Sequence, residues 1–396
     1  MSSGEGLSNR YQPHITFVVN HVAFFVSHRL PIALETQRRG YIVDLLTGQA
    51  GSDSMESGAQ HALSSTGVAH RRLTFRSSGI NPVIEFWGLL QLVWFLRRRR
   101  PDLVHCVSPK GLLYGGLAAR LAGVQGVVLA VSGMGYAFTK ANRKSVLRSF
   151  VGAVYILLAR LAYGHPNKRV IVQNLDDKRA VIDSGLAKSH EVHLIPGSGV
   201  NLRIFVSAVI EEKHQIVLFP ARMLVDKGVI EFVEAVRLLK GRIHGWRFIL
   251  AGAADYQNPS SIPRQQIEDW QADGLVEWLG HVEDMTPLFR LASIVCLPSY
   301  REGMPKSLLE AAAAGCAVIT TDTTGCREAI LPGETGDLVP VQDNKSLAEA
   351  LLSLINDRQR RERYGYAGRR LAISRFDINA VSNRTLEIYE ELIKNA

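Results

Sequence analysis

Short runs of β-branched and other apolar residues recur along the whole chain, with segments of helical pattern between them. The expected strands are 14–20, 42–47, 71–75, 103–108, 127–132, 169–173 and 192–195, then 215–221, 247–251, 276–280, 294–298, 317–321 and 337–339. Alternation of strands and helices at this spacing is typical of parallel, doubly wound sheets. The sequence therefore predicts an α/β fold.

A Gly-rich break at residues 196–201 separates the two sets of strands. The 396 residues exceed one typical core and fit two domains of usual size. We expect an amino-terminal domain over residues 1–198 and a carboxyl-terminal domain over 199–377. Residues 49–69, rich in Ser, Gly and Ala, are predicted to form a flexible loop near a cleft.

The positive charge is concentrated in the first half of the chain. Residues 1–200 carry a net charge of +12 and residues 201–396 a net charge of −3, which together give the total of +9. Such an excess indicates an anionic partner, either a membrane surface with lipid-linked substrates or a nucleic acid. The chain lacks aromatic-interleaved basic stretches and any helix-turn-helix or finger motif. We therefore expect a membrane surface and no nucleic acid.

Two apolar segments bear on that expectation. Residues 82–96 carry Trp87, Trp94 and Phe95 and run into Arg97–Arg100, an arrangement typical of a helix whose end meets lipid headgroups. The same segment fits a core helix with a solvated Arg run, and the sequence leaves both open. Residues 149–159 are too short to span a bilayer, and we expect them in the core.

The four cysteines, at positions 106, 296, 316 and 326, have neither C-x-x-C nor metal-ligand spacing. They are predicted to be buried, reduced thiols. Residues 1–13 are polar and lack the apolar segment of a signal peptide. We therefore expect a cytoplasmic protein, peripheral on the inner face of the cytoplasmic membrane.

The segment Tyr300–Glu310 carries the most chemistry. Glu302 and Glu310 lie eight positions apart on either side of Pro305, a residue that suits the first turn of a helix. The amides of residues 306–308 would then point out of a helix N-terminus, which favours an anion such as a diphosphate. On its own, such a pair of glutamates would better fit an ordinary βα unit with two surface carboxylates.

The segment resembles the donor-site signature of family 4 retaining glycosyltransferases of GT-B architecture. Residues 219–228, 279–284, 324–328 and 333–340 also resemble this family's pattern, in the same order. The resemblance implies that Glu302 faces the transferred sugar and Glu310 binds the ribose hydroxyls. Arg222 and Lys227 would clamp the diphosphate. It also implies donor contacts from Gly303, Met304, Pro305, Lys306, Ser307, His281 and Val282.

Residues 24–31, 131–139 and 173–177 resemble a narrower bacterial group, which adds sugars to polyprenyl-diphosphate-linked intermediates of O-antigen, capsule or glycoprotein glycans. Two features depart from the family pattern. Residues 20–23 lack the Gly-Gly pair of the first βα loop, and no His follows the strand that ends near Gly133. The expected acceptor-side residues are His28, Arg29, His105, Ser132 and Gly133. Residues 378–396 resemble the terminal helix that packs back on the first domain.

The function predicted from this resemblance is transfer of a hexose or N-acetylhexosamine from a UDP-sugar to a polyprenyl-diphosphate-linked saccharide, with retention of configuration. The chain shows no D-x-D metal motif after a strand, so neither a metal nor another cofactor is expected. A GT-B epimerase, a phosphorylase and an inactive sugar-nucleotide-binding module are the alternatives. A NAD-dependent enzyme is disfavoured because no G-x-G-x-x-G follows the first strand.

Overall fold

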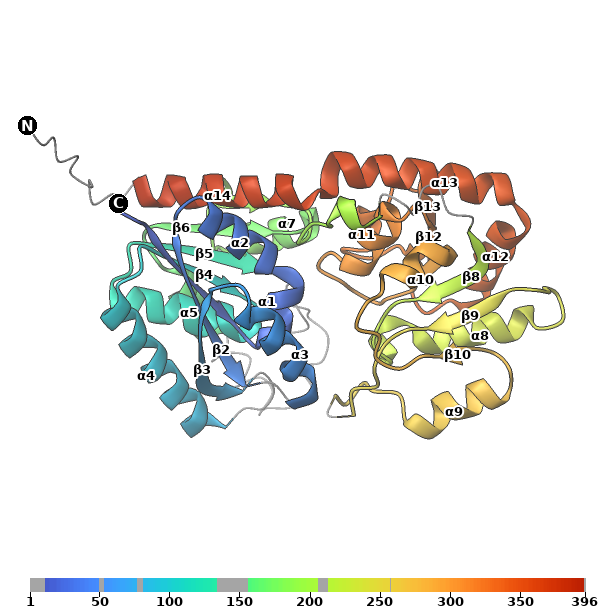
Figure 1. The fold of residues 1–396 in the computed structure, drawn as a ribbon, viewed down its shortest axis with the longest axis horizontal. Helices are drawn as coiled ribbons and strands as arrows, with labels where there is room; N and C mark the ends of the chain where they lie inside the picture. The colour runs from blue at the N-terminus through green and yellow to red at the C-terminus, as the bar shows by residue number, and fades with distance from the viewer. Residues whose placement is uncertain are drawn as a thin grey trace, which may run out of the picture.

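The computed structural model describes residues 11–49, 53–76, 81–133, 156–205, 213–256 and 258–394. They form two α/β domains that lie side by side, each around one parallel sheet (Figure 1). The seven strands of the first sheet have the order β3-β2-β1-β4-β5-β6-β7. They are β1 (His14–Val19), β2 (Ile42–Gln49), β3 (Ala69–Arg76), β4 (Leu103–Val107), β5 (Gly126–Val131), β6 (Lys168–Val172) and β7 (Val192–Leu194).

The six strands of the second sheet have the order β10-β9-β8-β11-β12-β13. They are β8 (His214–Phe219), β9 (Arg247–Leu250), β10 (Glu277–Trp278), β11 (Ala292–Leu297), β12 (Ala317–Thr321) and β13 (Gly336–Val339). Each expected strand is present, with ends that differ by a few residues at most. The predicted α/β, doubly wound fold is confirmed.

The strands form where the sequence predicts them because both faces of each sheet are covered by helices. Val18 of β1 is fully buried on the side of α4 and α5, and its neighbour Phe17 is fully buried against α14. A central strand buried on both faces must be a continuous apolar run. The helices of the first domain include α1 (Val22–His28), α2 (Leu30–Arg38), α3 (Asp53–Ser64), α4 (Pro82–Arg99), α5 (Pro109–Ala122) and α7 (Leu175–Asp183), and residues 156–163 are also helical.

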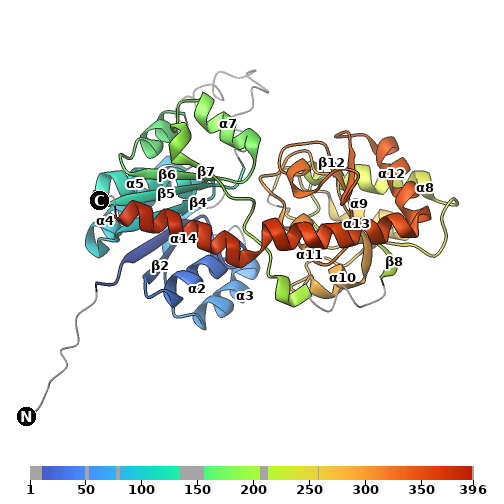
Figure 2. The same cartoon turned by 90° about the horizontal axis from the view of Figure 1, so that it is seen from above.

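The helices after the linker follow the same βα alternation. They are α8 (Val229–Leu239), α9 (Arg264–Ala272), α10 (Thr286–Leu291), α11 (Lys306–Ala313), α12 (Asn344–Asn356), α13 (Arg358–Leu371) and α14 (Ile378–Lys394). A π-helical turn at Ala372–Phe376 joins α13 to α14. The helix α14 then leaves the second domain and packs on α2, β4, β5 and β6 of the first (Figure 2).

The chain crosses between the domains twice, and the two crossings touch. Val200 N donates to Phe376 O at 2.8 Å, and Ile378 N donates to Val200 O at 3.1 Å. The domain limits at residues 198 and 377 stay predictions.

One prediction about the first domain is wrong. Part of residues 49–69, expected to be a flexible loop, forms α3. The Ser, Gly and Ala content of this segment hides the helix, which contacts α1 and buries Leu63 and Glu56. Glu56 also pairs with Arg72 on β3 at 3.0 Å.

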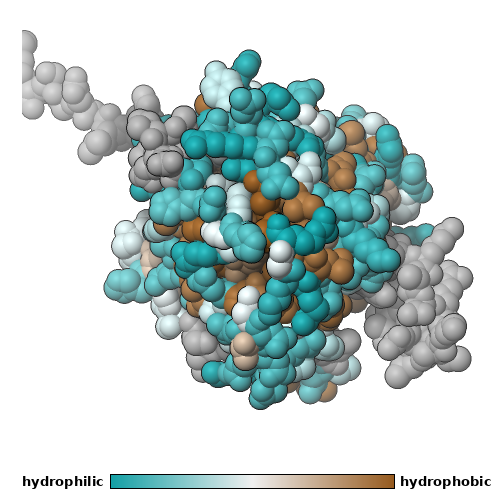
Figure 3. Space-filling view, turned by 90° about the vertical axis from the view of Figure 1, so that its right-hand side faces the viewer, coloured by the Kyte–Doolittle hydropathy of each residue, from teal (hydrophilic) through white to brown (hydrophobic). Residues whose placement is uncertain are grey.

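Other predictions about the chain have mixed outcomes. All four cysteines are buried and free, as expected. Most of residues 149–159 lie outside the described part of the chain, and within the remainder Ala159 is buried while Ile156 and Leu157 are exposed. No described helix is long and apolar enough to cross a membrane. Figure 3 looks at the end formed by the second domain, where hydrophilic residues cover most of the face and apolar ones gather near its centre.

Candidate active site

The second sheet reverses its strand order between β8 and β11, and the loops that follow these two strands meet. Open α/β sheets bind ligands outside the carboxyl ends of the strands at such a switch point. Lys227 follows β8 and Glu302 follows β11, and the Lys227 Nζ lies 2.5 Å from the Glu302 Oε1. Ser299 Oγ donates to the same carboxylate oxygen at 2.8 Å. The structure thus brings together two of the predicted catalytic residues.

The backbone explains how Lys227 reaches this position. Lys227 ends a single 3-10 turn (Val225–Lys227), and Gly228 follows it with a φ of +75°. A Cβ on Gly228 would lie 2.1 Å from the Pro298 carbonyl oxygen. Only a glycine lets the β8 loop approach the end of β11 so closely. The Asp226 carbonyl completes the junction by accepting from Tyr300 N at 2.9 Å.

Arg222, the third predicted catalytic residue, does not contact Glu302. Its Nη1 lies 2.7 Å from the Asp255 Oδ2, and its side chain is half-exposed. Burial lowers the pKa of His21, which caps the start of α1, while the Glu56 charge raises it and the Arg222 charge lowers it. In this structure Arg222 is paired with Asp255.

The helix α11 begins directly after the Glu302 loop, with Pro305 as its N-cap residue. Lys306 Nζ lies 3.3 Å from the Glu310 Oε1 one turn further on, and it donates to Ser27 O of the first domain at 3.1 Å. Burial raises the pKa of Glu310, and Lys306 partly offsets this effect. The two predicted donor carboxylates thus have different cationic partners, Lys227 for Glu302 and Lys306 for Glu310.

The other predicted donor residues surround this helix start. Gly303 and Met304 are buried between Glu302 and Pro305, and Ser307 is half-buried in the first turn of α11. Of the two remaining predicted donor residues, His281 is exposed and Val282 packs against the core of the second domain. No contact in the described residues links these two to Glu302, so their role stays a prediction.

The first domain contacts the Glu302 loop through backbone that follows β5. A Cβ on Gly303 would lie 2.3 Å from the Ser132 carbonyl oxygen, and one on Gly133 would lie 3.3 Å from the Gly303 Cα. Ser132 and Gly133, predicted on the acceptor side, are therefore in direct contact with the residue next to Glu302. The close approach explains why residue 303 is a glycine.

A second contact from the first domain was not predicted as part of the site. Asn174 is buried at the start of α7, where its Oδ1 accepts from Asp177 N at 2.7 Å. Its Nδ2 donates to Gly303 O at 2.7 Å, and Asp177 lies 3.4 Å from the Arg301 Nη2. We call Asn174, Asp177, Arg301 and Gly303 the interdomain clamp. The sequence indicates Asn174 only as a helix N-cap, because Gly303 and Arg301 lie more than 120 positions from Asn174 and Asp177.

The neighbouring Asp176 extends this contact. Its Oδ2 accepts from Thr324 Oγ1 at 2.7 Å and lies 3.3 Å from the Arg327 Nη1. The loop after β12 is thereby also attached to the first domain. A Cβ on Gly325, whose φ is +81°, would lie 2.4 Å from the Glu302 carbonyl oxygen. The Glu302 loop and the loop after β12 are therefore both held by contacts from the first domain.

His28 and Arg29 lie at the end of α1, opposite Lys306. Arg29 is almost fully buried, and its Nη1 donates to His28 O at 3.1 Å. Burial lowers its pKa to about 10, and within the described ranges no carboxylate pairs with it. Burial, with Lys306 and Arg29 adding, lowers the pKa of His28 to about 3. A buried guanidinium without a carboxylate is unusual, because removing a charge from water is costly unless it is compensated.

His105 does not fit its predicted role as an acceptor contact. It lies on β4, almost fully buried, stacks on Phe17 and hydrogen-bonds the Tyr389 hydroxyl of α14 through its Nδ1. Burial holds its pKa well below the usual value. We therefore assign His105 to the core between the sheet and α14. The sequence could not show which face of β4 it occupies.

Two known families match this chain, one over each sheet-containing domain. The glycosyl transferase 4-like domain matches residues 28–197, and the family described as glycosyl transferases group 1 matches residues 201–371. The N,N'-diacetylbacillosaminyl-diphospho-undecaprenol alpha-1,3-N-acetylgalactosaminyltransferase of Campylobacter jejuni is 28% identical over 335 residues, which cover 81% of this chain and 85% of that protein.

A second relative is the UDP-Gal:alpha-D-GlcNAc-diphosphoundecaprenol alpha-1,3-galactosyltransferase of Escherichia coli. It is 26% identical over 292 residues, or 70% of this chain and 73% of that protein. Among solved structures, sucrose-phosphate synthase from Thermosynechococcus elongatus has a TM-score of 0.76 at 20% identity, covering 97% of this chain and 100% of that chain. With the two parallel sheets, these matches show a glycosyltransferase of GT-B architecture that combines a glycosyl transferase 4-like domain with a glycosyl transferases group 1 domain.

Proposed function

We propose that this glycosyltransferase moves a hexose or N-acetylhexosamine from a UDP-sugar to a polyprenyl-diphosphate-linked saccharide, with retention of configuration. The product would serve assembly of a surface polysaccharide, O-antigen or glycoprotein glycan. The observation that carries the proposal is the contact between Lys227 and Glu302 at the switch point, directly before the start of α11. The relatives from C. jejuni and E. coli are named for undecaprenyl-diphosphate acceptors, which supports the acceptor class.

The main chemical problem is the charge of the departing nucleoside diphosphate. Lys227 carries three N–H donors, so it can keep its contact with Glu302 and still donate to a phosphate oxygen. Arg222 would turn from Asp255 to the diphosphate, and the amides at the start of α11 would donate to it. Cations and amides fixed at the developing charge lower the barrier for the leaving group without a metal.

The two carboxylates then have separate tasks. Glu302, held by Lys227 and Ser299, would orient the transferred sugar and stabilise positive charge at its anomeric carbon. Glu310, one helical turn beyond Lys306, would accept hydrogen bonds from the ribose hydroxyls. His281 and Val282 would lie near the base.

The acceptor would approach from the first domain. Ser132 and Gly133 already touch the Glu302 loop. Arg29, buried without a carboxylate partner in the described residues, and His28 lie at the end of α1, from which Ser27 contacts Lys306. Because a diphosphate-linked acceptor is an anion, it would compensate the Arg29 charge.

We also propose that the protein works as a peripheral protein at the cytoplasmic face of the membrane. The +12 charge of residues 1–200 favours an anionic surface. The helix α4 leaves several large apolar side chains exposed, among them Phe86, Trp87 and Trp94. Exposed aromatic residues on one side of a surface helix are typical of interfacial binding. Of the two interpretations left open by the sequence, exposure favours the membrane.

A screen of nucleotide sugars tests the donor proposal. At a concentration of 100 Kd, a bound donor should stabilise the protein by about 2.7 kcal/mol, or roughly 5–10 °C in melting temperature for a domain of this size. UDP-sugars should shift the transition, and turnover should then require a lipid-diphosphate acceptor. Product without an acceptor would favour an epimerase, and binding without turnover would favour an inactive module. If no UDP-sugar shifts the melting temperature, the donor proposal is wrong.

A further inference from the structure

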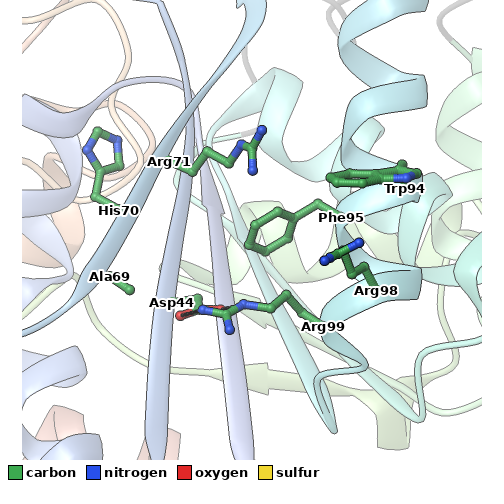
Figure 4. Close-up of a pocket in the computed structure, with 8 residues that line it drawn as sticks. All are labelled: Asp44, Ala69, His70, Arg71, Trp94, Phe95, Arg98 and Arg99. Carbon is green, nitrogen blue, oxygen red and sulfur yellow. Dashed lines mark hydrogen bonds and ion pairs between the residues drawn. The ribbon is translucent and has the colours of Figure 1, made fainter.

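A cavity of about 500 Å³ lies on the first domain between β2, β3 and the carboxyl end of α4 (Figure 4). Its walls include Asp44 near the start of β2, Arg71 near the start of β3, and Trp94, Phe95, Arg98 and Arg99 of α4. The starts of parallel strands share one edge of a sheet, whereas Ser132 and Asn174 follow the strand ends at the opposite edge. The cavity is therefore separate from the active site.

Two of the three arginines in the cavity are not neutralised. Arg71 and Arg98 both lie over the Trp94 ring. The guanidinium carbon of Arg71 is 5.9 Å from the ring centroid, and that of Arg98 is 5.5 Å from it. No acidic partner of either occurs in the part of the chain that the structure describes. Arg99 differs, because its Nε lies 3.1 Å from the buried Asp44 Oδ2 (Figure 4). The site thus carries two uncompensated guanidinium groups gathered at one indole.

This arrangement fits an anion. Guanidinium groups present planar pairs of N–H donors that match phosphate oxygens, and they stack on aromatic rings at the same time. The Arg71 and Arg98 guanidinium groups both lie within about 6 Å of the Trp94 ring centroid and both line the cavity. A phosphate bound in the cavity would offset their like charges and add charge-assisted hydrogen bonds.

The surface next to the cavity indicates which kind of molecule would carry a phosphate bound there. Val83, Phe86, Trp87, Leu90 and Trp94 have exposures of 65, 59, 57, 41 and 53%, and they form one stripe along α4. The stripe ends at the cavity, since Trp94 belongs to both. The acidic residue of this helix, Glu85, is on the buried side and pairs with Lys110 at 2.7 Å.

A free anion needs no apolar neighbour, whereas a phospholipid places its phosphate directly beside its acyl chains. We propose that the cavity of Arg71 and Arg98 binds the headgroup phosphate of an anionic phospholipid while the α4 stripe enters the lipid interface. This inference rests on the proposed peripheral membrane function and assigns to it a specific headgroup site.

The test is binding of the full-length chain to phosphatidylcholine vesicles with and without phosphatidylglycerol, at one fixed salt concentration. The Arg71→Gln/Arg98→Gln variant should bind the phosphatidylglycerol vesicles about 30-fold more weakly, which corresponds to two contacts of about 1 kcal/mol each. Arg203→Gln/Arg384→Gln is the matched control. It removes the same charge from two exposed arginines that do not line the cavity, and it should lose no more than a few-fold.

Two further arms separate the outcomes. Phe86→Ser/Trp87→Ser should weaken binding to both kinds of vesicle, because it alters the stripe and leaves the cavity intact. Equal losses in the arginine variant and its control would overturn the headgroup site but leave the membrane proposal standing. Failure of the unaltered protein to bind either vesicle would overturn both. Glycerol phosphate should compete only weakly, and saturation of the cavity arginines by it without vesicle binding would contradict the lipid assignment.

Discussion

The substitution Gly303→Ala tests the contact between the domains with a single methyl group. The new Cβ would lie 2.3 Å from the Ser132 carbonyl oxygen, 2.5 Å from its carbonyl carbon and 2.9 Å from the Gln173 Oε1. Two of these atoms are backbone, so they cannot move aside by a rotamer change. The Glu302 loop must then shift away from the first domain.

The cost follows from the contacts that the shift breaks. Overpacking by one methyl group typically costs about 1–3 kcal/mol. The hydrogen bond from Asn174 to Gly303 O would add about 1 kcal/mol. A loss of about 2–4 kcal/mol in the transition state corresponds to roughly a 30- to 1,000-fold lower rate, if transfer requires the clamped arrangement.

The assay compares kcat and KM for donor and acceptor in Gly303→Ala and in Gly368→Ala. The control makes the same chemical change inside α13, where the nearest atom to the new Cβ is 3.6 Å away. That variant should keep full activity and gain up to about 1 kcal/mol of stability, because alanine favours a helix over glycine. Activity of Gly303→Ala within threefold of the unaltered protein would refute the role of the clamp.

Three other outcomes are expected. Arg222→Ala and Lys227→Ala should each lose about 2–4 kcal/mol of transition-state stabilisation, or roughly 30- to 1,000-fold in rate, with the fold intact by circular dichroism; near-normal turnover in both would remove them from the site. Glu310→Gln should chiefly weaken donor affinity and Glu302→Gln should chiefly lower kcat, and equal effects on affinity alone would contradict this division. The pKa of His28 falls from 6.5 to about 3 on folding. At acidic pH the unfolded chain therefore binds a proton at His28 that the folded chain does not, so the free energy of unfolding should fall by about 2 kcal/mol between pH 7.5 and pH 5. Denaturant titrations at several pH values should show that the free energy of unfolding of His28→Gln lacks this part of the pH dependence. The same pH dependence in the variant and the unaltered protein would show that His28 titrates normally.

The sequence was sufficient to predict the strands, the family and the two-sheet fold, because buried parallel strands leave continuous apolar runs. It was not sufficient for α3. That helix contains Gly58 and several serines, and its stability comes from contact with α1 and from the pair between Glu56 and Arg72. Such tertiary contacts override local propensity and leave no periodic signal.

The positions of the site residues could also be predicted from the sequence only in part. The contact between Lys227 and Glu302 follows from strand order, since the loops after β8 and β11 must meet at a switch point. The position of His105 depends on which face of β4 it occupies and on Tyr389, 284 positions away. The clamp at Asn174 likewise depends on how the two domains approach each other. Neither relation is encoded in local sequence.

We propose retaining transfer in which cations and helix amides, in place of a metal, neutralise the leaving diphosphate. The most direct measurement is proton NMR of the new anomeric centre, made on product formed from an α-linked UDP-sugar and a polyprenyl-diphosphate saccharide in excess EDTA. We expect an α-linked product at an undiminished rate. A β-linked product, or activity that is lost in EDTA and restored by Mg²⁺ or Mn²⁺, would contradict it.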